Sequence, residues 1–234
     1  MSMLEIENLD ARYGDFQALF GISLNVRRGE TIALVGANGA GKTTLLRAIA
    51  GLGQYHAGVL RLNGRDIGSA SPQELARMGI SMVPEGRRLF TGMSVAENLM
   101  IGADLGRGGH WVRDAVFDLF PEIAVMAHRP AGLLSGGQQQ MVSLGRALMT
   151  NPDLLLVDEV SLGLAPVVVD RVYAALAQLK ERKTTLVVVE QDIRRALDVS
   201  DRFYCMLSGR VALAGASAPA AFDAVSRAYF GEAA

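Results

Sequence analysis

The chain has 234 residues, with 24 acidic and 23 basic side chains and a formal net charge of −1. This balance excludes a protein that binds nucleic acid or acidic lipid through an overall basic charge. The length fits one domain or one and a half domains, and such a chain is large enough to fold without disulfides. The single cysteine, Cys205, cannot form an internal disulfide and indicates a cytosolic protein.

Half of the residues are hydrophobic, yet no uninterrupted apolar run approaches the roughly 18 to 20 residues of a membrane-spanning helix. The N-terminal region carries Glu5, Glu7 and Asp10, whereas a signal peptide would have basic residues followed by an apolar stretch. We therefore expect a chain that neither spans a membrane nor is exported.

The first fifty residues predict strands followed by a helix. Residues 4–13 and 21–26 have strand patterns with turn signals between them. The β-branched run at residues 31–35 precedes a helical pattern over residues 42–50. The first two strands are expected to form an antiparallel flank beside a mostly parallel core.

The middle of the chain, from about residue 94 to 150, has little strand signal and several helix starts. Ser94 and Glu97 have the spacing of a capping box. Turn-rich residues, 84–86 and 151–152, border this region. We predict an inserted helical subdomain over about 86–150 and a discontinuous α/β core built from about 1–85 and 151–234.

The last third alternates strands and helices. Each predicted strand is followed by a predicted helix, in the order 154–157, 167–180, 186–189 and 192–199. Residues 203–213 favour a hairpin around Ser208 and Gly209. The near-continuous apolar strands indicate a parallel sheet that is buried on both faces.

Residues 36–43 fit the phosphate-binding pattern G-x-x-x-x-G-K-[ST], directly after a predicted strand and at the start of a predicted helix. They are Gly36, Ala37, Asn38, Gly39, Ala40, Gly41, Lys42 and Thr43, and the predicted nucleotide-binding run extends to Thr44. Glycines let backbone N–H groups surround phosphate oxygens, and the helix N-terminus adds positive potential. We expect Lys42 to reach the β- and γ-phosphates and the Thr43 hydroxyl to ligate Mg²⁺.

Two carboxylates, Asp158 and Glu159, end the apolar strand that begins at Leu154. Buried carboxylates are costly unless a cation or a reacting group uses them. Asp158 is the natural Mg²⁺ partner and Glu159 the natural base, and strand alternation should point them in different directions. The alternative is a solvated acidic pair at a strand end.

A second candidate anion site lies at Ser135-Gly136-Gly137-Gln138, which follows Leu134 and precedes a helical pattern. Ser135 and Gln138 have capping-box spacing, so the simplest interpretation is a well-capped helix. Two adjacent glycines are nevertheless an unfavourable way to begin a helix. A bare backbone with a serine hydroxyl at a helix N-terminus would bind phosphate.

These three motifs and their order resemble the ATP-binding subunits of ABC transporters over nearly the whole chain. The resemblance implies an α/β fold, a RecA-like P-loop NTPase core of mixed sheet with an antiparallel flank and an inserted helical subdomain. It also implies a head-to-tail dimer in which Ser135, Gly136, Gly137 and Gln138 contact the γ-phosphate bound by the partner. Tyr13 matches the aromatic residue on which this family stacks adenine; the alternative is a half-buried strand tyrosine.

Three positions depart from the general family pattern. Glu85 stands where most members have a glutamine that contacts Mg²⁺ and water, and Gln191 stands where most have a histidine that contacts the γ-phosphate. Val160 replaces the proline that usually follows the second carboxylate. The runs VPEGRR, SLGLAP and VEQ, which include Glu85 and Gln191, together resemble the subunit of branched-chain amino acid importers that is usually paired with a second, similar ATPase.

The resemblance implies an ATPase that drives an importer of branched-chain amino acids, with ATP and Mg²⁺ as cofactors. Glu159, Gln191 and Glu85 would act in catalysis, and Thr43, Asp158 and Glu85 would hold the metal. The implied partners are a second ATPase subunit in a heterodimer or homodimer, two permease subunits and, indirectly, a periplasmic binding protein. The implied location is the cytoplasmic face of the inner membrane. Nucleic acid is not among the implied partners. The alternatives are a urea, amide or lipopolysaccharide transporter, a soluble ABC ATPase, and a P-loop kinase or GTPase.

Overall fold

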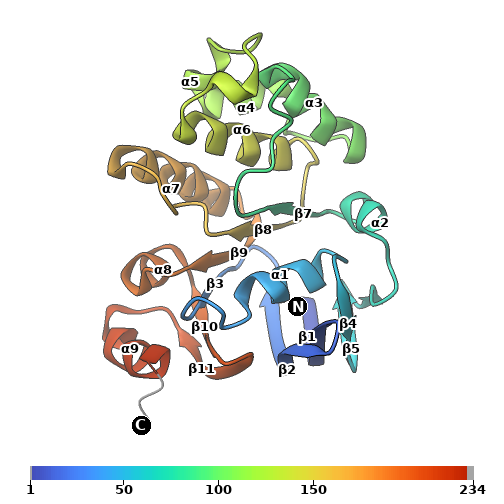
Figure 1. The fold of residues 1–234 in the computed structure, drawn as a ribbon, viewed down its shortest axis with the longest axis vertical. Helices are drawn as coiled ribbons and strands as arrows, with labels where there is room; N and C mark the ends of the chain where they lie inside the picture. Colours follow the sequence, from blue (N-terminus) through green and yellow to red (C-terminus); the bar gives the residue numbers. More distant parts are fainter. Residues whose placement is uncertain (1, 231–234) are drawn as a thin grey trace. The chain divides into compact units, whose positions relative to one another are not determined.

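The computed structural model describes residues 2–230, which divide into two compact units (Figure 1). The first unit takes the chain up to Pro72 and again from Lys180 onward, and the second unit is Gln73–Leu179. Within the described part, no helix combines the length and the apolar character that crossing a membrane requires. The predicted boundaries near residues 85 and 151 stay a prediction.

The first unit is built mainly from strands. Its strands are β1 (Ser2–Tyr13), β2 (Phe16–Arg27), β3 (Thr31–Val35), β4 (Gln54–His56), β5 (Val59–Leu62), β6 (Arg65–Asp66), β9 (Thr185–Glu190), β10 (Arg202–Leu207) and β11 (Arg210–Ala216). Its helices are α1 (Lys42–Ile49), α8 (Ile193–Val199), the 3-10 helix η2 (Pro219–Ala221) and α9 (Phe222–Phe230).

The predicted antiparallel flank is confirmed as a sheet in which β1 pairs with β2, β4 and β5, and β5 pairs with β6. Figure 1 shows β1 and β2 as a hairpin near α1. The strand β2 begins at Phe16, five residues earlier than expected. Its Gly21 has a φ of 62° where the pairing register shifts, so this glycine marks a bulge within the strand and not the turn before it.

The parallel core of the first unit has β3 between β10 and β9, with β11 added antiparallel to β10. Every residue of β3 and β9 is buried, as their apolar sequences predict. Ser208 and Gly209 form the expected hairpin turn, with φ of 48° and 75°. Helices α8 and α9 pack on this sheet through a cluster that contains Ala33, Val35, Ala196, Leu197, Phe203, Cys205 and Val225.

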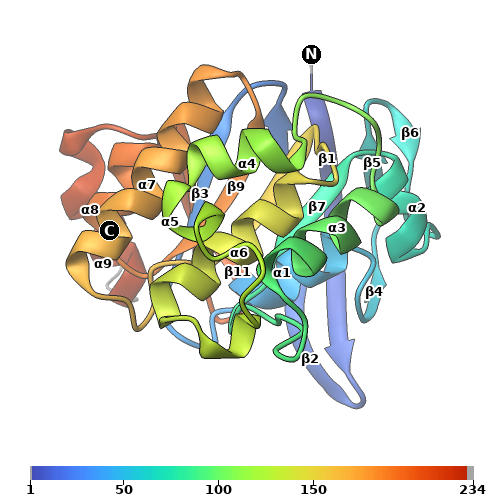
Figure 2. The same cartoon turned by 90° about the horizontal axis from the view of Figure 1, so that it is seen from above.

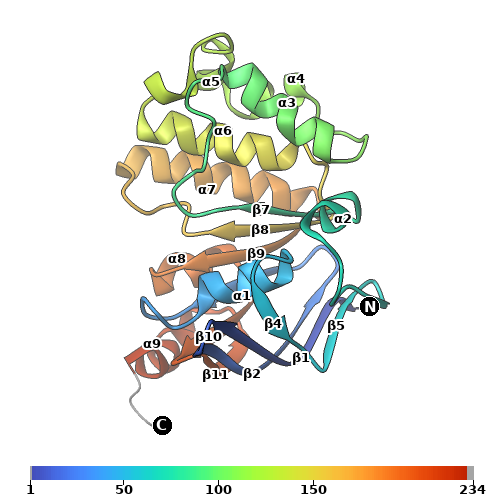
Figure 3. The ribbon, with the colours of Figure 1, turned by 45° about the vertical axis from the view of Figure 1, so that its right-hand side comes forward.

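The second unit is mostly helical. Its elements are α2 (Pro72–Arg77), β7 (Ile80–Val83), α3 (Val95–Leu105), α4 (Arg113–Leu119), α5 (Pro121–Ala124), the 3-10 helix η1 (Ala131–Leu133), α6 (Gly136–Leu148), β8 (Leu154–Asp158) and α7 (Pro166–Glu181). Strands β7 and β8 pair in parallel. In Figure 3, α7 lies next to these two strands, and α6 and then α3 lie farther out.

Both predicted capping boxes are present. Ser94 caps α3 with Glu97, and Ser135 caps α6 with Gln138, each with reciprocal hydrogen bonds between side chain and backbone. Helix α3 lies beside α6 (Figure 2). A Cβ atom at Gly102 of α3 would overlap the carbonyl oxygen of Arg146 in α6, so the two helices can approach this closely only because residue 102 is glycine.

Candidate functional site

The predicted phosphate-binding loop lies between β3 and α1 in the first unit. Gly36, Gly39 and Gly41 have φ of 155°, 80° and 98°, which favour glycine. A Cβ atom at Gly41 would lie 2.5 Å from Leu19 Cδ2, whereas one at Gly39 would meet no atom within 4 Å. Gly36 and Gly41 are therefore needed for the backbone conformation or for close packing. Gly39 leaves the tip of the loop open for a ligand.

The side chain of Lys42 lies within this loop. Its Nζ donates hydrogen bonds to the carbonyl oxygens of Gly36, at 2.7 Å, and of Ala37, at 3.1 Å. Lys42 is 4% exposed, so its ammonium group is held inside the loop. A buried cation within this glycine-rich loop fits the binding of an anion such as a phosphate.

The structure brings together two predicted nucleotide-binding residues, Tyr13 and Thr44. Tyr13 is the last residue of β1 and Thr44 lies in the first turn of α1. Their hydroxyl oxygens are 3.3 Å apart. Tyr13 is 47% exposed, so both the stacking role and the alternative of a half-buried strand tyrosine fit its position, and adenine stacking stays a prediction.

Gln191 directly follows β9, and its position relative to the loop is set by strand pairing. Glu190, the last residue of β9, pairs with Val35, the last residue of the parallel strand β3. Gly36 and Gln191 therefore leave the sheet at the same edge, from neighbouring strands. Asp192 then caps α8 by accepting a 3.1 Å hydrogen bond from Arg195 N, which fixes the backbone just after Gln191.

The second unit carries the two carboxylates of the β8 strand end. Asp158 is the last residue of β8 and is 1% exposed. Glu159 lies beyond the strand and has a φ of 45°, and Val160 is buried after it. We expected the alternation of side chains along a strand to point the two carboxylates in different directions. That reasoning is wrong, because the backbone leaves the extended conformation at Glu159.

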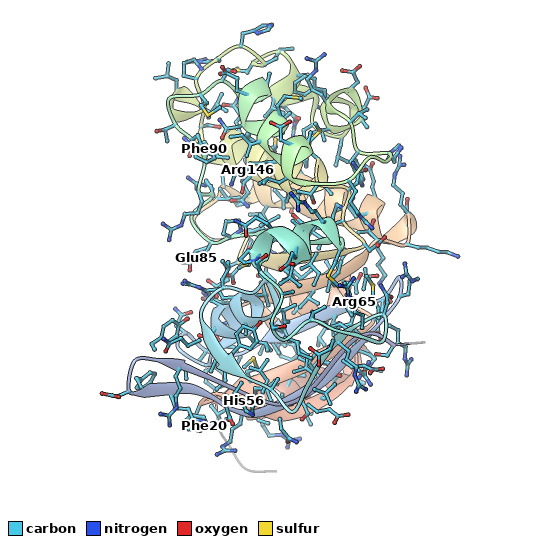
Figure 4. The ribbon with its side chains drawn as sticks, turned by 90° about the vertical axis from the view of Figure 1, so that its right-hand side faces the viewer. Phe20, His56, Arg65, Glu85, Phe90 and Arg146 are labelled. Atoms are coloured by element: carbon cyan, nitrogen blue, oxygen red, sulfur yellow. The ribbon has the colours of Figure 1, made fainter. Side chains whose placement is uncertain are left out.

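Glu85 lies at the same sheet edge as these carboxylates. Val83 ends β7 and pairs with Val157 of the parallel strand β8, so Pro84 and Glu85 leave the strand beside Asp158. Glu85 is exposed (Figure 4). Among the described residues, no three His, Cys, Asp or Glu side chains lie close enough together to hold a metal ion, so Mg²⁺ ligation by Glu85 and Asp158 stays a prediction.

The motif at the start of α6 has the geometry of a capped helix. Gln138 N donates to Ser135 Oγ at 3.3 Å, and Ser135 N donates to Gln138 Oε1 at 3.0 Å. A Cβ atom at Gly137 would lie 2.5 Å from Val168 Cγ1 in α7, and one at Gly136 would lie 3.0 Å from Arg87 Nη2. The two glycines thus allow tight packing and also leave backbone N–H groups at a helix N-terminus, where anions bind.

The contacts that join the loop after β7, which contains Glu85, to α6 were not predicted from the sequence. The carbonyl oxygen of Arg87 accepts hydrogen bonds from Ser143 Oγ, at 2.9 Å, and from Arg146 Nη2, at 3.2 Å. Arg87 Nη1 donates to Gln139 Oε1 at 3.4 Å. No spacing rule could reveal these contacts, because they join residues more than fifty positions apart.

Arg146 also faces the aromatic ring of Phe90, which lies farther along the chain after Arg87. Its Cζ lies 5.8 Å from the centre of the Phe90 ring, and Figure 4 shows these two side chains close together. Burial lowers the pKa of Arg146 below its usual value, as expected for a guanidinium group that is partly removed from water. The loop that follows β7 and contains Glu85 is therefore attached to α6, the helix capped by Ser135.

Comparisons with known proteins show the family and the fold. Residues 19–161 match the family model described as ABC transporter. The chain is 40% identical over 213 residues to the high-affinity branched-chain amino acid transport ATP-binding protein BraG of Pseudomonas aeruginosa, covering 90% of this chain and 91% of that protein. It is 36% identical over 217 residues to the probable branched-chain amino acid transport ATP-binding protein LivF of Archaeoglobus fulgidus, covering 91% and 92%.

The fold is similar to that of a nucleotide-free ATP-binding cassette from an ABC transporter. The TM-score is 0.84 at 29% identity, over 97% of this chain and 96% of that one. The expected α/β fold of the P-loop NTPase type is confirmed.

Proposed function

The chain belongs to the ABC transporter family, and from this premise we propose that it is the ATP-hydrolysing subunit of an importer of branched-chain amino acids. The observation that carries the proposal is its identity of 40% over 213 residues to a branched-chain amino acid transport ATP-binding protein. The runs VPEGRR and VEQ, which contain Glu85 and Gln191, support the same assignment.

We propose that the loop from Gly36 to Thr44 binds the phosphates of ATP. Lys42 supplies a positive charge, and the Thr43 hydroxyl is an oxygen ligand for Mg²⁺. Asp158 and Glu85 supply carboxylate oxygens for the same ion. When bound, Mg²⁺ neutralises phosphate charge; these residues hold and orient the ion.

Glu159 is proposed as the general base that orients the attacking water. Its backbone is fixed between the end of β8 and the buried Val160, so its carboxylate is attached to a rigid strand end. Gln191 is proposed to donate an amide hydrogen bond to a γ-phosphate oxygen. As a neutral donor it stabilises developing charge less than an imidazolium group would.

The proposed assembly pairs this subunit with a second ABC ATPase, with heterodimer favoured over homodimer. In it, the residues from Ser135 to Gln138 contact ATP held by the partner. Two permease subunits bind the dimer at the cytoplasmic face of the membrane, and a periplasmic binding protein delivers the amino acid. Substrate choice then lies in the permeases and the binding protein.

The proposal is tested in a transporter reconstituted in liposomes from this chain, its second ATPase, the permeases and the binding protein. We expect ATP-dependent uptake of labelled leucine and none of labelled urea. Glu159→Gln should keep ATP bound while hydrolysis at this subunit's site falls by roughly 10² to 10⁴, because the base is lost.

The exposed glutamate Glu181 provides the matched control, since Glu181→Gln should hydrolyse ATP like the unaltered protein. Uptake of urea in place of leucine would refute the substrate class. Rapid hydrolysis at this site by Glu159→Gln would assign the base to another residue, with Glu85 the first to examine.

A further inference from the structure

The hydroxyl groups of Tyr13 and Thr44 join two segments that the predicted nucleotide site uses for different parts of the ligand. Tyr13 ends β1, and Thr44 follows Lys42 and Thr43 in the first turn of α1. The 3.3 Å separation of their oxygens is within hydrogen-bond distance. The aromatic ring is therefore attached directly to the phosphate-binding segment.

The backbone of Tyr13 is fixed independently of this hydrogen bond. Tyr13 pairs with Phe16 across a two-residue turn at the tip of the β1–β2 hairpin. Next to this pair, Arg12 Nη2 donates to Gln17 Oε1 at 3.1 Å, and Gln17 Nε2 donates to Asp10 Oδ1 at 3.0 Å. These contacts fix the Cα end of the residue, but its side-chain torsions still need a second attachment.

An exposed tyrosine without such an attachment would sample several rotamers. Ordering a side chain when a ligand binds reduces affinity, and a side chain already held in the bound orientation avoids this cost. Tyr13 is 47% exposed, so packing covers only about half of its side chain. The hydrogen bond to Thr44 is a directional contact that can hold the hydroxyl end of the ring.

We propose that Thr44 is a positioning residue for Tyr13. Its hydroxyl fixes the ring at a set place relative to the phosphate-binding loop, so that nucleobase and phosphates are bound together and not independently. The inference rests on the proposed function and on the expectation, implied by the family resemblance, that Tyr13 stacks on adenine.

The test compares the dissociation constants of ATP and inorganic tripolyphosphate, measured by calorimetry on the full chain. The ratio of tripolyphosphate to ATP dissociation constants reports the contribution of the nucleoside alone. We expect Tyr13→Phe and Thr44→Val each to lower this ratio by about two- to tenfold, the usual effect of one hydrogen bond. Thr44→Ser keeps a hydroxyl and should restore the ratio.

Two further variants complete the design. The double variant Tyr13→Phe with Thr44→Val should lower the ratio no further than either single change, because both remove the same hydrogen bond. Tyr55→Phe is the matched control. Tyr55 lies in β4, in the same sheet as Tyr13, but its hydroxyl donates to Gly68 O at 3.2 Å. This substitution should leave the ratio unchanged.

Each outcome decides a separate question. An unchanged ratio in Tyr13→Phe, multiplied losses in the double variant, or no recovery in Thr44→Ser would overturn the role of Thr44. Tyr13→Ala tests the premise: if it lowers the ratio while Tyr13→Phe does not, adenine stacking stands and the positioning role fails. If Tyr13→Ala also leaves the ratio unchanged, the proposed stacking role is itself wrong.

Discussion

Cys205 lies in the buried cluster that packs α8 and α9 on the sheet of the first unit. Burial raises the pKa of its thiol to about 11. Because the thiolate is the reactive form, we expect the folded protein to resist iodoacetamide at about pH 8, where a free cysteine of pKa near 8.5 reacts. The measurement is the mass increase with time, with urea-unfolded protein as the control. Labelling of the folded chain as fast as the unfolded one would contradict the burial of this thiol.

At the level of single residues, local motifs were the easiest to recognise in the sequence. The motif from Gly36 to Thr43 could be recognised because it is contiguous, and its binding role stays a prediction. The cap of Ser135 with Gln138 was predicted and confirmed because a capping box depends only on residues three positions apart. Arg87 could not be recognised in this way, since its contacts with Ser143 and Arg146 are made only when distant segments pack together. The hydrogen bond between Tyr13 and Thr44 also depends on tertiary structure, although each residue was predicted separately.

The predicted elements succeeded where a strong pattern coincided with clear ends. Strand β3 was predicted with its observed bounds because a charged turn and a glycine loop border five apolar or β-branched residues. Strand β2 was placed too late because Gly21 has the sequence signal of a turn but lies in a bulge. The short strands β4 and β6 have too few residues for a period to be recognised.

The contact between helices α3 and α6 gives a prediction for stability. In an isolated helix, Gly102→Ala would be favourable by about 1 kcal/mol. Here the added Cβ would overlap the carbonyl oxygen of Arg146 and lie 3.0 Å from Met149 Cβ, so we expect a loss of about 1 to 3 kcal/mol in the free energy of unfolding. Urea denaturation measures the change.

Gly108 supplies the comparison for this variant. A Cβ atom at Gly108 would meet nothing within 4 Å, so Gly108→Ala should leave the free energy of unfolding nearly unchanged. If Gly102→Ala were as stable as the unaltered protein, α3 could shift away from α6 without cost. The close packing of these helices would then not be needed for stability.

At the scale of the whole molecule, the proposed role of Gln191 favours the proposed asymmetric assembly. Gln191 is an amide where most of the family has a titratable histidine. A neutral donor to the γ-phosphate should stabilise the transition state less than an imidazolium group, by about 1 to 2 kcal/mol. A subunit with this defect gains most from a partner that keeps the histidine, which is the physical reason to favour a heterodimer.

The pH dependence of hydrolysis tests this reasoning. Purified alone, the chain should hydrolyse ATP slowly and without an inflection between about pH 6 and 7.5, because an amide has no proton to lose in that range. Gln191→His should introduce an inflection near the usual histidine pKa of about 6.5. Gln73→His places the same side chain at an exposed position and should not change the profile. A fast wild-type rate that changes through this range would mean that another group titrates in the rate-limiting step, and the argument for an asymmetric dimer would then fail.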